Sequence, residues 1–355
     1  MTMLAETVDA VIGTGTHRDT HEVEIADAAG KPIAVLRISN DSAGFTRLLA
    51  TIAKAAPGPR VAVCMEGSRS YGIGLARALA AAGLLVIECE QPSRRQRRGK
   101  GKSDPIDAHL AVLAALRLDA SRLPVPRADG DREALRILLV ARQEITVART
   151  AQAGRLRALL LTGDDTDRQA ARTTLPGKAL AALAGRDLAA DASREQAVRQ
   201  AEIRRLAEAL DQARRQLKDN RAQLLTIVED IAPGLTNRYG VGPVSAAQAI
   251  VSFSHPGRCR SEAAFAALAG TSPVPASSGQ TVRHRLNRGG DWALNRAIHA
   301  IALVRMRSCP RTRAYVARRT AEGKTPREIR RCLKRYIARE LYRQLTRTMN
   351  PPVSP

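Results

Sequence analysis

Short apolar runs and turn residues alternate over the N-terminal part of the chain, up to residue 89. The first three runs follow one another with only turns between them, which predicts strands in hairpin order. Two stretches with helical spacing of apolar residues come next, and an apolar strand follows each of them. This order predicts an α/β domain with a mixed sheet. We expect strands at 8–15, 21–26, 32–38, 61–66 and 84–89, and helices at 42–55 and 70–82.

The remainder of the chain has the apolar spacing of helices. Two long amphipathic segments, 131–161 and 193–231, are joined by a connector rich in Ala, Gly and Asp. They predict an antiparallel helical hairpin or a coiled coil, which projects from the body or pairs with another subunit. Shorter helices are expected at 240–253, 261–269 and 292–306, and a very basic helical region at 311–347.

Proline, glycine and small residues divide the chain into units. The predicted units are an α/β domain at 1–120, a helical coiled-coil or linker segment at 121–231, a mainly helical C-terminal domain at 232–349 and a disordered tail at 350–355. The small-residue stretch 271–280 predicts an exposed loop in the C-terminal domain. The turn from Gly240 to Pro243 precedes a helix, and it fits either a backbone contact to phosphate or a plain helix connection.

The charge balance indicates a polyanionic partner. The 57 Lys and Arg residues outnumber the 34 Asp and Glu residues and give a net charge of +23. From 305 to 347 there are 15 basic residues against three glutamates, which is too unequal for salt-bridged helix faces, so we expect nucleic-acid contact there. With one Trp, five Tyr and three Phe, the chain cannot bind single strands by extensive base stacking.

The five cysteines are scattered and include no Cys-X-X-Cys pair. This argues against a disulfide framework or a zinc site and fits a reducing compartment. No apolar run reaches the length of a membrane span, and no basic-then-apolar signal opens the chain. We therefore expect a soluble intracellular protein without membrane contact.

Three carboxylates of the predicted α/β domain are candidate metal ligands. Glu66 closes a buried strand, and Asp104 and Asp107 lie three positions apart at a helix start, where both can point to one side. The plain alternative is that Asp104 caps this helix and Pro105 is its first residue. Two Mg²⁺ ions on such oxygen ligands suit phosphodiester chemistry, because they stabilise the attacking and leaving oxygens. A basic run stands directly before the pair: Arg94, Arg95, Arg97, Arg98, Lys100 and Lys102.

The small-residue loop is a second candidate centre. Ser277 or Ser278 could attack a phosphate, with neighbouring arginines stabilising the developing charge. The plain alternative is a linker, since Ser-Ser-Gly loops are common in proteins. No Ser/His/Asp triad can be recognised. The basic residues expected to contact nucleic acid here and in the tail helices are Arg283, Arg285, Arg288, Arg330, Arg331, Lys334 and Arg335.

Several stretches together resemble the DEDD-type transposases of bacterial insertion sequences, the bridge-RNA-guided serine recombinases. They are Val11–His21, Glu66–Leu75, Lys102–Ala108, and the C-terminal set Gly240–Pro243, Pro275–Gly279 and Arg288–Gly290. The resemblance spans nearly the whole chain. It implies an RNase H-like (RuvC-like) α/β domain, then a coiled-coil segment and a mainly helical transposase domain.

The resemblance also implies a function, cutting and rejoining DNA. Four acids of the family hold Mg²⁺, and Glu66, Asp104 and Asp107 match three of them. Ser278 matches the serine that becomes covalently joined to DNA, with Ser277 as the other register. The implied partners are double-stranded DNA at the element ends and target, a structured guide RNA, and further copies of the chain in a dimer or tetramer. The implied location is the bacterial cytoplasm, at the nucleoid.

The resemblance fails at one position, because the place of the first acid is occupied by Gly15. Asp9 and Asp19 should not reach the same point, since a shift along a strand changes both position and face. The loss of one hard ligand predicts weak Mg²⁺ binding and low or absent DNA cleavage. Two other functions stay open: a RuvC-like metal-dependent nuclease without a covalent intermediate, and a nucleic-acid-binding protein without catalysis.

Overall fold

The computed structural model describes residues 2–89, 104–127, 129–187, 192–275, 284–285, 287 and 289–349. The chain divides into two compact units, Met1–Glu133 with Phe253–Arg260, and Ala134–Ser252 with Ser261–Pro355. The first unit is built on a sheet, whereas the described residues of the second form helices and one short hairpin. The predicted basic run at 94–102, the serine pair, Arg283, Arg288 and the tail at 350–355 lie outside the described residues.

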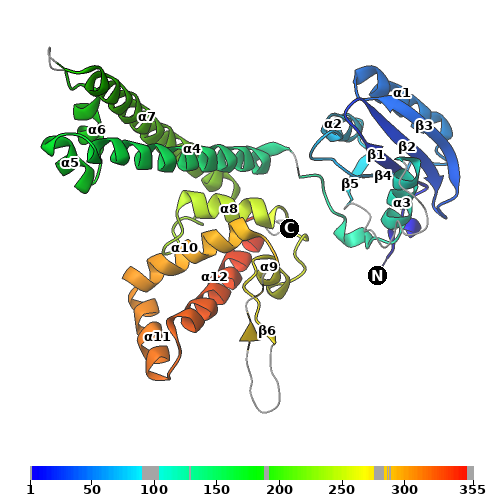
Figure 1. Ribbon diagram of the computed structural model, residues 1–355. Coiled ribbons are helices and arrows are strands. Elements are labelled where there is room, and N and C mark those ends of the chain that lie inside the picture. The colour runs from blue at the N-terminus through cyan, green and yellow to red at the C-terminus, as the bar shows by residue number, and fades with distance from the viewer. Residues whose placement is uncertain are drawn as a thin grey trace. The chain divides into compact units, whose positions relative to one another are not determined.

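The first unit contains a five-stranded mixed sheet with the order β3-β2-β1-β4-β5 (Figure 1). Strands β1, β2 and β3 pair antiparallel, whereas β4 is parallel to β1 and β5 is parallel to β4. The mixed sheet predicted from the hairpin order and the later helix–strand alternation is therefore confirmed. The strands are β1 (Ala10–Thr16), β2 (Thr20–Asp27), β3 (Pro32–Ser39), β4 (Val61–Met65) and β5 (Leu85–Glu88).

Side chains on the two faces of this sheet enter two separate cores, because neighbouring residues of a strand point to opposite sides. Ile12 and Val63 pack with α1 and α2 on one face. Val11 and Ala62 pack with α3 on the other face. The helices of this unit are α1 (Ser42–Ala55), α2 (Ile73–Ala81) and α3 (Asp104–Leu116), with short 3₁₀ helices at Leu4–Glu6 and Ala120–Arg122.

Helix α3 runs in the opposite direction to β1. Beyond its C-terminal end, the carbonyl of Leu118 accepts a 2.8 Å hydrogen bond from the N–H of Leu4, in the segment that leads into β1. At Gly13 the two backbones approach so closely that a Cβ there would lie 2.0 Å from the carbonyl oxygen of Ala108. The first turn of α3 is therefore placed at the carboxyl end of β1, and this placement needs glycine at position 13.

The variant Gly13→Ala should be destabilised by about 1–3 kcal/mol, because backbone atoms of α3 must shift to admit the methyl group. Gly154→Ala in α4 (Gly130–Leu161) is the matched control, since a Cβ there meets no atom within 4 Å. Alanine inside a helix should stabilise by roughly 0.5–1 kcal/mol. Urea unfolding followed by circular dichroism measures both changes. A Gly13→Ala protein as stable as the parent would contradict the close approach.

Helices α4 and α7 (Arg194–Ile231) of the second unit pack antiparallel (Figure 1). A guanidinium N–H of Arg142 donates to the carbonyl of Leu217 at 3.0 Å, and the amide of Asn220 donates to the carbonyl of Leu138 at 2.9 Å. The other ends of both helices share an apolar core with α6. The predicted helical hairpin is confirmed, whereas pairing with another subunit stays a prediction.

The connector of this hairpin contains two short helices, as expected, and the C-terminal part contains five more helices and a hairpin of strands in the residues described. No helix of the described residues is both long and apolar enough to cross a membrane. The remaining elements are α5 (Asp165–Arg172), α6 (Gly177–Ala184), α8 (Pro243–Phe253), α9 (Glu262–Leu268), β6 (Val274–Pro275), β7 (His284–Arg285), α10 (Trp292–Ser308), α11 (Pro310–Ala321) and α12 (Pro326–Met349).

Two predictions were wrong. The stretch 271–280 is not loop throughout, since β6 pairs antiparallel with β7 and begins a hairpin there. Two residues are too few to show strand periodicity, so the sequence pattern missed it. The scattered cysteines do include a bonded pair, because Cys64 and Cys89 form a disulfide. They lie 25 positions apart in the chain and become neighbours only when β4 pairs with β5.

Candidate functional site

Gly15 and Glu66 lie at the carboxyl ends of two neighbouring parallel strands. The last pair of the parallel register joins Thr14 of β1 to Met65 of β4. Gly15 and Glu66 each follow directly after these paired residues. The hydroxyl of Thr16 donates a 2.9 Å hydrogen bond to the carbonyl of Glu66, which ties the two strand ends together. This edge is where parallel strands place functional side chains.

Both positions belong to the face of the sheet that α3 covers. Val11 and Gly13 of β1 face α3, and alternation along the strand puts Gly15 on the same side. On β4, Cys64 lies in the core beneath α3. Glu66 follows two positions later, directly after the strand ends, so the same alternation puts it on that side. Gly15 and Glu66 therefore share one edge and one face of the sheet.

The first turn of α3 brings two further acids to this edge. Asp107 is half-buried, and its Oδ1 atom is shielded from solvent. Asp104 begins the helix, and its side chain lies outside the described residues. Because α3 runs opposite to β1, its first turn lies on the same side as Gly15 and Glu66.

The donor set fits a divalent cation in its chemistry. Carboxylate oxygens are the ligands that Mg²⁺ prefers in proteins. Among the side chains that the structure describes, no three His, Cys, Asp or Glu residues lie close enough together to hold a metal ion. A three-carboxylate set with Glu66 and Asp107 therefore depends on Asp104. Gly15 contributes no ligand.

Another acid at this sheet edge, Glu88, has a structural role. It pairs with Met65 across the strands and so belongs to the opposite face. Its carboxylate accepts a 3.0 Å hydrogen bond from Nε of Arg127 and lies 3.2 Å from Nε of Arg69. Burial alone would raise the pKa of Glu88, but the two guanidinium groups lower the pKa below its usual value. The stabilisation from this cluster is present above the ordinary glutamate pKa and is lost as the pH falls.

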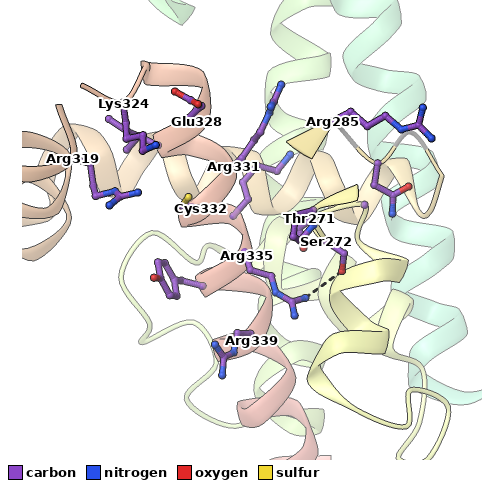
Figure 2. Close-up of a pocket in the computed structure, with 16 residues that line it drawn as sticks. Thr271, Ser272, Arg285, Arg319, Lys324, Glu328, Arg331, Cys332, Arg335 and Arg339 are labelled. Carbon is purple, nitrogen blue, oxygen red and sulfur yellow. Dashed lines mark hydrogen bonds between the residues drawn. The ribbon is translucent and has the colours of Figure 1, made fainter. Parts of the chain in front are cut away.

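The second unit contains a basic pocket of about 720 Å³ beside the β6–β7 hairpin (Figure 2). Such a volume suits a ligand of nucleotide size. Figure 2 shows Arg331, Arg335 and Arg339 of α12 on one side of it and Thr271 and Ser272 on the other. Arg335 donates a 3.3 Å hydrogen bond to the hydroxyl of Ser272 across the cavity. One acid, Glu328, and seven basic residues are among its lining: Arg285, Arg319, Lys324, Arg331, Lys334, Arg335 and Arg339.

Lys334 carries a partly buried positive charge in this pocket. Its Nζ atom donates a 2.5 Å hydrogen bond to Oδ1 of Asn295, a neutral acceptor, and Asn295 in turn donates to the carbonyl of Ala269 at 2.6 Å. In the described part of the chain no carboxylate pairs with Lys334. Burial lowers the pKa of Lys334, because the charged form loses hydration without gaining a counter-ion. An anionic group in the pocket would supply that counter-ion.

Other arginines of the pocket are already paired. Arg339 contacts Glu262 at 2.7 Å. Arg319, near the end of α11, pairs with Glu322 in the turn that follows this helix. The electrostatic attraction of the pocket for an anion therefore centres on Lys334 and its neighbours on α12 rather than on all seven basic groups.

The structure places some, but not all, of the basic residues predicted to contact nucleic acid around this pocket. Arg285, Arg331, Lys334 and Arg335 line the pocket. Arg330 is not among the lining residues, and its Nε atom donates to the carbonyl of Pro326 at 3.3 Å. Sequence reasoning missed three of the seven basic lining residues. Arg339 could have been found, since residues 331, 335 and 339 recur at helical spacing. The two others, Arg319 and Lys324, come from the preceding helix and turn.

The turn before α8 behaves as a plain helix connection. Gly240 has a positive φ of 76°, which favours glycine there. The N–H of Gly242 donates to the hydroxyl of Ser245 at 3.1 Å, so this backbone donor already has a partner inside the protein. The phosphate contact considered for this turn gains no support from the structure.

Comparison with known proteins gives two family matches and one relative. Residues 12–163 match the DEDD transposases of the IS110 type, a family described as "Transposase". Residues 234–317 match the "Transposase IS116/IS110/IS902 family". An "Insertion element IS110 uncharacterized 43.6 kDa protein" of Streptomyces coelicolor is 32% identical over 123 residues, which are 34% of this chain and 30% of that protein. The matched stretch therefore spans less than a third of that relative's length.

Proposed function

Because this chain belongs to the IS110 family of transposases, we propose that it is the transposase of an insertion sequence and that it cuts and rejoins DNA. The chain has the fold expected of that family, an RNase H-like sheet followed by a mainly helical region. The observation that carries the proposal is the convergence of Gly15, Glu66 and the first turn of α3 on one edge and one face of that sheet. The basic pocket of the C-terminal unit supports the same function.

In this proposal Glu66, Asp104 and Asp107 hold Mg²⁺. When bound, the ion stabilises the negative charge on the attacking and leaving oxygens of a phosphodiester. The protein positions these acids by backbone contacts, since Thr16 anchors the backbone at Glu66 and the close approach at Gly13 anchors α3.

Ser278 is the proposed nucleophile, with Ser277 as the other register. The hydroxyl oxygen bonds to phosphorus and loses its proton, while the bond to a DNA oxygen breaks and that oxygen takes up a proton. The reverse step with another DNA end releases the serine and rejoins the strand. Both serines belong to the segment between β6 and β7, and Arg285 of β7 lines the basic pocket.

The proposed partners follow from the charge and from the family. The pocket around Lys334 binds a phosphate group of nucleic acid, because it offers a partly buried cation without a carboxylate partner among the described residues. Double-stranded DNA and a structured guide RNA both carry that group. A dimer or tetramer located at the nucleoid is part of the same proposal.

Lys334→Met should weaken binding to DNA of any sequence and lower the slope of log affinity against log salt by about 1, as expected for one lost phosphate contact. Lys218→Met removes the same charge from an exposed position on α7, away from the pocket, and is the matched control. Fluorescence anisotropy at several salt concentrations measures both slopes. Equal slopes for the two variants would contradict a phosphate in the pocket.

The same site predicts a pH dependence. Only the protonated ammonium attracts phosphate, and burial lowers the pKa of Lys334. DNA affinity should therefore fall as the pH rises through this lowered pKa, below the ordinary lysine value of about 10.4. Lys334→Arg keeps its charge throughout this range, so the variant should lose that fall. Superimposable pH profiles for parent and variant would contradict the assignment.

The experiment that tests the function is a strand-exchange assay with labelled element-end and target DNA. Joined products that require Mg²⁺ support the transposase. The glycine at position 15 favours one alternative, a protein that binds nucleic acid without catalysis, which predicts salt-sensitive binding but no joined product with any divalent metal. Nuclease treatment of the purified protein tests for the guide, because a bound RNA should remain as a protected fragment.

A further inference from the structure

We propose that Glu22 takes the place of the missing first acid and supplies the fourth carboxylate of the metal site. This inference rests on the proposed function, because it concerns the same Mg²⁺ centre. Near Gly15 in the sequence, the acids that could replace the first metal ligand are Asp9 and Asp19, which flank the strand that contains Gly15. The paired strand β2 contains a better-placed acid.

Glu22 is the direct cross-strand partner of Gly15 in the antiparallel pair β1–β2. Directly opposed residues of such a pair point to the same face of the sheet. The cores agree, since Ala26 of β2 lies in the core beneath α3, whereas Val23 and Ile25 lie in the core on the other side. Glu22 therefore shares the face on which Gly15, Glu66 and α3 meet.

The distance between the two positions suits the longer acid. Opposed residues have Cβ positions about 4.5–5.5 Å apart, and glutamate reaches one methylene further than aspartate. Gly15 has no side chain to compete for the space. As placed in the structure, Glu22 does not form a metal-holding group with Glu66 and Asp107. Its carboxylate must therefore rotate away from Arg37 and toward the first-acid position when the metal binds.

Glu22 has an exchangeable partner in the structure. Its side chain is 7% exposed, and its carboxylate pairs with Arg37 of β3, whose side chain is 65% exposed. A buried carboxylate requires a counter-charge, whereas an exposed guanidinium keeps its hydration when the pair separates. We infer that Arg37 neutralises Glu22 and gives up the carboxylate when the metal binds.

Glu24 provides an internal comparison on the same strand and the same face. It lies opposite Gly13, where the carbonyl of Ala108 closes the space above β1. Its carboxylate lies 2.7 Å from Nδ1 of His109 on α3. Glu24 is thus held in place further from the strand ends, and we do not assign it to the metal.

The test is calorimetric titration of Mn²⁺ into the full chain and its variants. Glu22→Gln should lower the affinity by roughly tenfold or more, because even the groups that orient metal ligands have effects of that size. Glu24→Gln should leave the affinity unchanged. Gly15→Asp in the Glu22→Gln background should restore the affinity, which also demonstrates that the double variant is folded. Thermal unfolding without metal checks the single variants.

Each outcome decides the inference. Equal affinities of the parent and Glu22→Gln overturn it, and so does a loss that Gly15→Asp fails to restore, since Glu22 would then act on the structure alone. An equal loss in Glu24→Gln also overturns it. If the parent binds poorly and Gly15→Asp alone binds well, Glu22 does not replace the first acid, but the metal site of the proposed function stands. If no protein binds Mn²⁺, including Gly15→Asp, both fall.

Discussion

Ser278→Ala is expected to abolish the covalent protein–DNA adduct and to lower strand joining by at least about 10³-fold. The substitution removes the proposed nucleophile but none of the charges that attract DNA. Water could still cut DNA in its place. Hydrolysis leaves no covalent serine–phosphate bond, however, so a second DNA end would have nothing to displace and rejoining would fail. Labelled DNA on a denaturing gel measures the adduct, and anisotropy should give unchanged DNA affinity.

Ser277→Ala is the matched control for Ser278→Ala, because Ser277 is the other candidate position for the nucleophile. An adduct that survives Ser277→Ala and disappears in Ser278→Ala supports the assignment. The opposite result moves the nucleophile to Ser277. If both variants and the parent cut DNA equally and no adduct forms, the chain is a RuvC-like nuclease that uses water.

Asp107→Asn should lower Mg²⁺-dependent DNA cleavage by about 10³-fold, because metal ligation contributes several kcal/mol to the transition state and each 1.36 kcal/mol is tenfold in rate. The amide has the shape of the carboxylate, so the half-buried position at the start of α3 should be retained. Cleavage measured over a Mg²⁺ titration tests this expectation. A rate equal to that of the parent would remove Asp107 from the site.

Asp9→Asn is the control for this variant. Asp9 precedes β1 at the end opposite to Gly15, and its carboxylate pairs with Arg60, which lowers the pKa of Asp9. The same loss of charge at the far end of the strand should leave the metal dependence unchanged. A parallel loss in both variants would indicate a general effect of charge and not a ligand role.

The secondary structure of the chain was largely predictable because its signals are local. The periodicity of apolar residues predicted the five strands and the long helices to within a few residues. The start of α1 is also fixed locally, since Asp41 caps the helix by accepting a 2.8 Å hydrogen bond from the N–H of Gly44. The β6–β7 hairpin was missed, since two paired residues have no period.

The candidate site was only partly predictable. Glu66 and Asp107 could be named as candidate ligands because strand ends and helix starts are visible in the sequence, and the family resemblance pointed to Gly15 as the place of the first acid. Nothing local distinguishes Glu66 from Glu88, since both end a buried strand. The structure separates them, because Arg127 and Arg69 neutralise Glu88 on the opposite face.

The sequence by itself determined which elements form, which acids and serines are available for chemistry, and the family to which they point. The tertiary structure alone decided which of these residues are neighbours. It joined Cys64 to Cys89, gathered the basic residues around Lys334, and set Glu22 opposite Gly15. The physical reason is that strand pairing and register are selected by the burial of both faces of the sheet at once. That condition depends on residues far apart in the chain, so no local pattern contains it.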